Sequence, residues 1–329
     1  DSQYTRALSY SCLAYDIESL ASPSLAALAL LFLSYDMLFV ANGVTFIASA
    51  LLIFLATLPV SKVSDTEGTV WLNLTSGVRA YLSTPRLRGL LALSFALACG
   101  GAMVIVNTVV YVRDLLGGTE TDTAMVLAFY GGGSMIAALL LPKWLDRHPD
   151  RMPMLAGSIL ICVALGFGAM LPSYAGVFAV WFVLGVGSSL VQTPAGRLLK
   201  RSSTEENRAA IYAAQFALSH ACWLIAYPMA GWLGSLLGLQ ITFAVLSALA
   251  ISGGLMAAML WRGNDASILS HTHESVSHSH QHIHDEHHQH EHEGWEGPEP
   301  HSHEHHHEPI THKHEFIIDR HHRSWPHQG

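Results

Sequence analysis

The sequence has few of the residues on which enzymes and disulfide-bonded domains depend. Only four of its 329 residues are cysteine, and no two of them form a Cys-x-x-Cys pair, so no disulfide framework is implied. The sequence also has no phosphate-binding glycine loop, no nucleophile elbow and no His-Glu-x-x-His helix. Charged residues make up only 13% of the chain. We therefore expect neither an enzyme nor a required cofactor.

Apolar residues dominate the sequence instead, at 50% of the chain. They form long stretches, each near the roughly 20 residues that cross a bilayer as a helix. We expect about eight such helices, at residues 11–33, 37–58, 90–112, 123–141, 154–171, 175–196, 209–233 and 239–261. The predicted fold is an all-α polytopic membrane protein in contact with lipid.

The basic residues between these spans favour one side of the membrane. Alternate loops and the flanks carry Arg6, Lys62, Arg79, Arg86, Arg88, Lys143, Arg147, Arg151, Arg197, Lys200, Arg201, Arg208 and Arg262. The opposite loops carry only Arg113. The positive-inside rule makes the basic side cytoplasmic, and an even number of spans then places both ends there. We expect a multi-pass protein of a bacterial inner membrane, and the scattered charge predicts no nucleic-acid partner.

The end of the chain has a very different composition. Of 22 histidines, 20 lie between His271 and His327. From residue 271 onward, the chain has 11 acidic and 3 basic residues, whereas the part before it has 14 of each. The tail therefore accounts for the whole net charge of −8. Few aliphatic residues and the breakers Pro298, Pro300 and Pro309 predict a disordered tail.

Histidine beside carboxylate suits divalent nickel, cobalt, zinc or copper, and a tail without cysteine is a poor site for Cu(I). In an extended segment residues two apart share a face, so each His-x-His offers two ligands. The candidate ligands are His271, His273, His278, His280, His282, His284, His287, His288, His290, His292, His301, His303, His305, His306, His307, His312 and His314. An expression tag and a pH-sensitive tail without a metal role are the competing interpretations.

Polar residues inside the predicted spans are candidates for a transport pathway, because such groups are costly in lipid. Asp16 and Glu18 suit proton coupling if burial raises their pKa, or else they lie at the interface. His220 is the only histidine in a span, and it is either a metal or proton acceptor or a hydrogen-bonded core residue. It shares a helical face with Tyr212, Phe216, Trp223 and Tyr227. Asn107, Gln192 and Gln215 are further pathway candidates.

Residues 142–151 resemble the G-x-x-x-D-R-x-G-R-R signature of the major facilitator superfamily. Asp146, Arg147 and Arg151 match it, whereas Pro142 and Pro149 stand in place of glycines. In that family such residues form a cytoplasmic charge network that gates alternating access. Ordinary flanking charge is the alternative interpretation. The resemblance implies twelve helices in two six-helix halves that a long cytoplasmic loop joins.

The layout that this resemblance implies is a partial facilitator fold followed by the tail. Residues 1–59 correspond to the last two helices of a first half, and residues 60–87 to the central loop, with an amphipathic stretch at 71–81. Residues 88–262 correspond to the whole second half, and residues 263–329 to a cytoplasmic metal-binding tail. Because the chain begins at Asp1 without an initiator methionine, we expect a fragment that lacks about four helices. We expect a monomer.

A segment of the first span is similar to the antiporter motif G-x-x-x-G-P-x-x-G-G of facilitator exporters. Ser22, Pro23, Ala26 and Ala27 keep its proline and small residues, while Glu18 replaces its first glycine. Residues 4–16 resemble bacterial facilitator exporters, and residues 192–197 and 312–319, with the pair at 325–326, resemble nickel-resistance exporters of the NreB type. This likeness implies efflux of nickel, or of cobalt, driven by the proton gradient.

Three functions follow from these observations. The leading hypothesis is a proton-coupled exporter whose cargo is a divalent metal, with a tail that captures metal but lies outside the membrane path. The second is an exporter of drugs or small organic solutes with a regulatory tail. The third is a membrane-anchored metal sensor or store.

Overall fold

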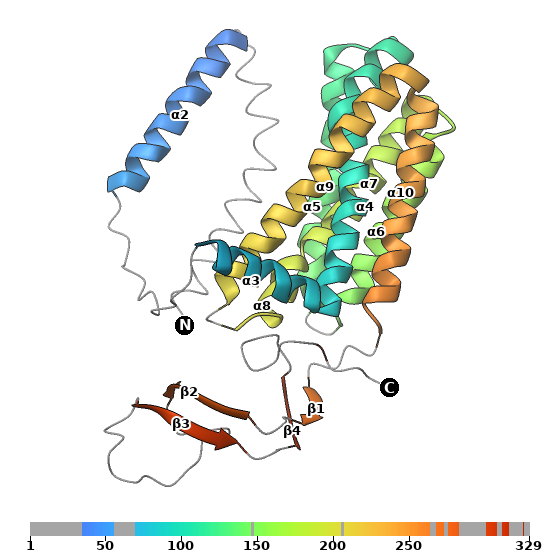
Figure 1. Cartoon of the computed structure of the whole chain (residues 1–329). Helices are drawn as coiled ribbons and strands as arrows, with labels where there is room; N and C mark the ends of the chain where they lie inside the picture. The colour runs from blue at the N-terminus through green and yellow to red at the C-terminus, as the bar shows by residue number, and fades with distance from the viewer. Residues whose placement is uncertain are drawn as a thin grey trace. The chain divides into compact units, whose positions relative to one another are not determined.

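The computed structural model describes residues 35–55, 70–145, 148–204, 207–263, 268–272, 276–282, 301–307, 311–315 and 325. The chain divides into two units, residues 1–263 and residues 264–329. The first is built of helices and the second of short strands (Figure 1).

The long helices of the first unit follow the predicted spans closely, and two shorter helices lie between them. They are α2 (Tyr35–Leu55), α3 (Val70–Ser83), α4 (Pro85–Val109), its π-helical continuation η1 (Val110–Leu115), α5 (Glu120–Leu145), α6 (Arg151–Gly168), α7 (Tyr174–Gln192), α8 (Ala195–Arg201), α9 (Arg208–Leu237) and α10 (Leu239–Leu260). In the described part of the chain, seven segments are long and apolar enough to cross a membrane. The prediction of an all-α polytopic protein is confirmed, while the predicted span at 11–33 lies outside the described residues.

Helix α4 is the centre of the bundle. In its most apolar stretch of 18 residues, 78% of the residues are buried inside the protein. The helix packs against α6, α7, α9 and α10. Small residues allow this close packing. A side chain at Gly101 would overlap the indole of Trp223 on α9, so only glycine lets the two helices approach this closely.

Helices α5 and α7 form the other close pair. Gly133 of α5 lies against the backbone of Phe182, and Gly185 of α7 lies against the carbonyl of Tyr130. Tyr130 also donates a hydrogen bond to Ser188 of α7 at 3.1 Å. Gly133 and Gly185 therefore mark where α5 and α7 touch.

Buried aromatic residues close the bundle at the end where α4 becomes η1. The rings of Tyr111, Trp181 and Phe243 meet edge to face at 5.8–6.2 Å between centroids. Trp181 Nε1 donates to Thr108 Oγ1 at 2.9 Å, and the Tyr111 hydroxyl donates to the carbonyl of Pro172 at 2.8 Å. These contacts join α4, α7 and α10.

The second unit departs from the expectation of disorder in four short segments. Strand β1 (Ile268–Thr272) pairs antiparallel with β4 (Thr311–Glu315), and β2 (Val276–His282) pairs antiparallel with β3 (His301–His307). Composition argues against a packed core here, but a two-stranded ladder forms backbone hydrogen bonds without one. The period-two alternation of histidine with other residues also suits an extended strand.

Candidate functional site

The basic residues of the helical unit meet at one end of the bundle, where α4, α6 and α9 begin. Contacts across this end show that its loops are neighbours: Arg86 of α4 reaches α8, and Arg151 of α6 reaches the end of α10. Arg113 belongs to η1, at the opposite end of α4. The alternation of basic and non-basic loops in the sequence thus becomes one basic end and one end with few basic residues.

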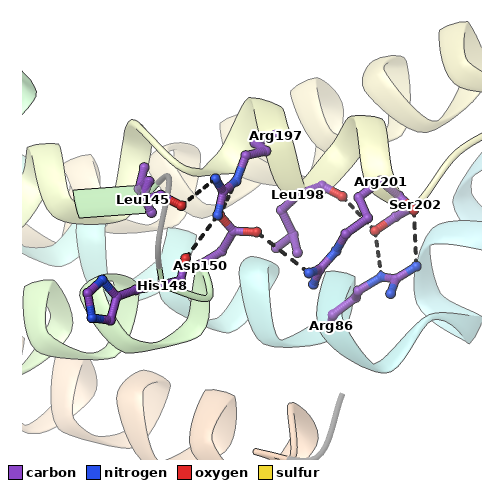
Figure 2. A network of polar contacts seen from close by, with 8 residues as sticks. All are labelled: Arg86, Leu145, His148, Asp150, Arg197, Leu198, Arg201 and Ser202. Carbon is purple, nitrogen blue, oxygen red and sulfur yellow. Dashed lines mark hydrogen bonds and ion pairs between the residues drawn. The ribbon is translucent and has the colours of Figure 1, made fainter. Parts of the chain in front are cut away.

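A buried carboxylate is the centre of the basic end. Asp150 directly precedes α6 and is 1% exposed. Its Oδ1 accepts a hydrogen bond from Arg197 Nε at 2.7 Å, and its Oδ2 lies 4.0 Å from Arg201 Nη1 (Figure 2). The two arginines are four residues apart on α8 and so share a helix face. A buried carboxylate costs free energy unless it is paired, and α8 supplies both partners.

Arg197 also holds the turn that leads to Asp150. Its Nη1 donates to the carbonyl of Leu145 at 2.7 Å, and its Nη2 donates to the carbonyl of His148 at 3.1 Å. Leu145 ends α5, where backbone carbonyls lack helical partners and a cation is favoured. One guanidinium therefore fixes the α5–α6 turn against α8.

Arg86 extends the network to α4. It is 1% exposed, its Nε donates to Ser202 Oγ at 2.8 Å, and its Nη2 donates to the carbonyl of Arg201 at 3.2 Å. Ser202 Oγ in turn donates to the carbonyl of Leu198 at 2.6 Å. Helix α8 is thus the common partner of the α5–α6 turn and of the first turn of α4, as Figure 2 shows.

The predicted gating residues are only partly described. The guanidinium of Arg151 binds the end of α10: its Nε donates to the carbonyl of Trp261 at 2.6 Å and its Nη2 to that of Ala258 at 3.2 Å, which ties α6 to α10. Asp146 and Arg147 lie outside the described residues. Asp150 was not among the residues predicted from the sequence, although it lies in the same segment, four residues before the predicted span at 154–171.

Helix α3 lies across the same end and joins α9 to α4. Tyr81 is fully buried, and its hydroxyl donates a hydrogen bond to Gln215 Oε1 of α9. Gln215 Nε2 donates to Ser94 Oγ of α4 at 3.4 Å. Burial raises the pKa of Tyr81, so its hydroxyl keeps the proton that it donates. Gln215, a pathway candidate from the sequence, is therefore also a tie between three helices.

Two other pathway candidates lie in different places. Asn107 is buried on α4, where its Nδ2 donates to the carbonyl of Ala230 on α9 at 3.1 Å. It is 13 residues beyond Ser94, which is about 20 Å along the helix axis. Gln192 is exposed at the last position of α7. The structure therefore does not bring Asn107, Gln192 and Gln215 into one site.

His220 is exposed on α9. Its Nδ1 lies 2.7 Å from the carbonyl of Phe216, and its ring lies 3.9 Å from the Phe216 ring. Because a carbonyl only accepts, Nδ1 is the donor, and Nε2 of the neutral ring keeps a lone pair for a proton or a metal. Farther along the stripe, Trp223 packs on α4, and its ring lies tilted against that of Tyr227 with the centroids 5.1 Å apart. The aromatic stripe thus changes from exposed to packed at His220.

The remaining candidates lie outside the described residues or in the tail. Among the residues that the structure describes, no three His, Cys, Asp or Glu side chains gather as a metal site. The undescribed candidates are Asp16, Glu18, Ser22, Pro23, Ala26, Ala27, His273, His284, His287, His288, His290 and His292. The other eleven candidate histidines of the tail belong to β1–β4.

Comparison with known proteins assigns the helical unit. The family model described as Major Facilitator Superfamily matches residues 90–284, which is more than half of the chain. The match begins in α4 and covers every helix after it. No curated protein matches the chain.

Proposed function

The chain belongs to the major facilitator superfamily, a family of secondary transporters and in general not of enzymes, and from that premise we propose that it exports a divalent metal ion, nickel or cobalt, in exchange for protons. The observation that carries this proposal is the concentration of 20 of the 22 histidines in the tail. A membrane transporter with so many imidazole ligands on one segment is suited to handle a borderline transition metal.

The proposed orientation places the basic end and the tail in the cytoplasm of a bacterial cell. The basic end carries the arginines that the positive-inside rule keeps on that side. A cytoplasmic tail meets the metal before export, which suits an exporter better than an importer. The metal would cross near the bilayer midplane, by rocking of two halves around a central site, and the tail would supply ions rather than form the path.

We assign the Asp150 network a role at the cytoplasmic gate. It joins the α5–α6 turn, α8 and the first turn of α4 through charged hydrogen bonds, which are buried at Asp150 and Arg86 and partly exposed at Arg197. Such an arrangement holds the ends of these helices as one body during rocking, because separating them would leave a buried carboxylate without partners.

The decisive experiment measures cellular nickel by mass spectrometry in bacteria that express the protein and in bacteria with an empty vector. We expect less nickel in the expressing cells, and we expect a proton uncoupler to abolish the difference. A variant whose tail histidines are all asparagine, at equal membrane abundance, should keep part of the effect. Unchanged nickel with the protein confirmed in the membrane would contradict metal export.

Export of a small organic solute is the second candidate function. It is favoured by the lack of a three-ligand metal group in the described residues and by the exposed aromatic rings of Tyr212 and Phe216 on α9. Aromatic faces bind planar organic cations. Accumulation of a fluorescent cationic dye in the same cells distinguishes the two: lower dye with unchanged nickel assigns the organic cargo.

A further inference from the structure

Four exposed basic side chains at the basic end take no part in the network around Asp150. They are Arg79 of α3, Arg88 of α4, Lys200 of α8 and Arg262, which lies two residues after the end of α10. Within the described part of the chain, none of them forms a hydrogen bond or an ion pair through its side chain. Among the described residues from α3 to α10, the only carboxylate at this end is Asp150, which is buried and already paired. The exposed surface of the described basic end is therefore positively charged.

Two of these cations, Arg88 and Arg262, flank a contact between α4 and α10. A Cβ atom at Gly89 would lie 2.7 Å from the Cβ atom of Trp261, so the two backbones approach closely there. Arg88 and Arg262 adjoin these two residues in the chain, and their Cα atoms are therefore at most about 13 Å apart. Two guanidinium groups at this spacing suit one phosphate group, or the two phosphates of one lipid molecule.

Arg151 adds a third guanidinium group at the end of α10. Its Nε and Nη2 donate to the carbonyls of Trp261 and Ala258 at 2.6 and 3.2 Å. Its Nη1 lies 3.8 Å from the place that a Cβ atom at Gly263 would occupy, next to Arg262. Helices α4 and α6 begin at this end, where their dipoles favour an anion. The end of α10 would repel an anion, but Arg151 already compensates its carbonyls.

An apolar surface continues from these arginines along the outside of α6 and α10 (Figure 1). The two helices are neighbours, because a Cβ atom at Gly254 of α10 would lie 2.5 Å from Ser158 Oγ of α6. Each helix has two apolar residues on one face that are more than half exposed, namely Met152 and Ile159 on α6, and Leu255 and Met259 on α10. Cations at the helix ends beside an apolar surface match the headgroup and the acyl chains of a phospholipid.

We propose that Arg88, Arg151 and Arg262 bind the phosphate headgroup of an anionic phospholipid, whose acyl chains lie along α6 and α10. Basic pockets between membrane helices on the cytoplasmic side bind such headgroups. A free phosphate ion would use the arginines but not the apolar surface, and this favours a lipid. The inference goes beyond the proposed function and does not depend on the cargo, because lipid binding by the purified protein is measured separately from cellular nickel.

The test compares two double variants of the full chain that lose the same charge. Arg88→Gln with Arg262→Gln removes two cations of the proposed site. Arg79→Gln with Lys200→Gln removes two exposed cations of the same end that lie outside it. Each purified protein, in a nonionic detergent, is titrated with cardiolipin and in parallel with phosphatidylcholine, which has no net charge. Native mass spectrometry counts the bound lipid, and the melting temperature confirms that each variant is folded.

We expect the unaltered chain to bind about one cardiolipin molecule tightly and to prefer it to phosphatidylcholine. Loss of Arg88 and Arg262 should weaken cardiolipin binding about 25-fold, because one basic residue at a headgroup contributes about 1 kcal/mol, or about fivefold. Loss of Arg79 and Lys200 should change it little. Equal weakening in the two variants would overturn the proposal, since any cation of this end would then suffice. Equal binding of the two lipids by the unaltered chain would overturn it as well.

A competition experiment distinguishes a lipid from a soluble anion. Inorganic phosphate in large excess should displace no more cardiolipin than sodium chloride of the same ionic strength, because it lacks acyl chains. Leu255→Asn with Met259→Asn should weaken cardiolipin binding, because both changes make the surface beside the acyl chains polar. Specific displacement by phosphate, together with unchanged binding by this variant, would assign the arginines to a free anion and overturn the lipid site.

Discussion

The basic end of the helical unit and the histidine tail are both rich in groups that bind ions, but they are organised in opposite ways. At the basic end one buried carboxylate, Asp150, has two specified arginine partners and each guanidinium has specified acceptors. In the tail, many histidines occupy repeated and nearly equivalent register positions. The difference teaches that single changes should have large effects at the basic end and small, graded effects in the tail.

The largest loss of stability is expected for Asp150→Ala, a single change at the basic end. Loss of Asp150 leaves Arg197 and Arg201 without their carboxylate. Because these side chains are 45% and 31% exposed, water can solvate them, and we expect a cost of about 1.5–3 kcal/mol, as for loss of a hydrogen bond to a charged group. We expect a large fall in melting temperature of the detergent-purified protein and in its membrane level. Glu120→Gln is the matched control, because its pairing with Arg113 at 3.5 Å is exposed, and such pairs contribute less than about 1 kcal/mol. Similar shifts in both variants would contradict the special position of Asp150.

The next prediction tests whether the stability of the helical unit depends on close helix packing as well as on charge pairing. Gly133→Ala places a methyl group against the backbone of Phe182, and overpacking of this kind costs about 1–3 kcal/mol. Its neighbour Gly132 has nothing within 4 Å of the added carbon, so Gly132→Ala should leave stability unchanged or slightly raised. Thermal unfolding of the two variants side by side is the measurement; equal destabilisation would rule out the close α5–α7 contact.

A smaller effect is expected for Tyr81→Phe. It removes the hydrogen bond to Gln215 and leaves the amide oxygen without that donor, at a cost of about 1 kcal/mol. Tyr212→Phe removes an exposed hydroxyl that donates to the carbonyl of Gly196 at 3.0 Å, and water can replace it. We expect the first variant to unfold at a lower temperature than the second. The reverse order would argue against α3 as a tie between α9 and α4.

The smallest effect belongs to the tail. A single substitution such as His306→Asn should leave nickel resistance without measurable change, because many other imidazoles remain. Removal of all residues after Leu269 should lower resistance only in part, since the tail lies outside the proposed path. Growth of expressing cells over a nickel series measures both. Complete loss of transport in the truncated protein at normal membrane levels would show that the tail is part of the path.

The membrane spans and the basic end of the bundle could be predicted from the sequence. The hydrogen-bond and ion-pair partners of individual polar residues could not. A continuous apolar stretch must become a helix in lipid, so α4, α5, α6, α7, α9 and α10 follow from hydropathy with small shifts in their ends, whereas the short basic helix α8 was not predicted. The pairing of Asp150 with Arg197 depends on how α8 meets the α5–α6 turn, which no local pattern encodes. Gln215 illustrates the same limit: its polarity suggested a pathway, but its partners come from α3 and α4.

In the tail, the chemistry of the residues could be predicted from the sequence, but their pairing could not. Composition alone predicted metal ligands and disorder there, and the chemistry of imidazole does not depend on fold. Which histidines stand opposite one another depends on the register of β2 against β3, and register is a property of two distant segments together.

The junction between α3 and α4 has a mechanical consequence. Only Thr84 separates the end of α3 at Ser83 from the start of α4 at Pro85, and its hydroxyl donates to the carbonyl of Ala80 at 2.9 Å. Proline fixes the backbone at the first turn of α4. A one-residue connection between two helices, stiffened in this way, is rigid. A movement of α3 is therefore transmitted to α4, the central helix of the bundle, and is not absorbed by a flexible linker.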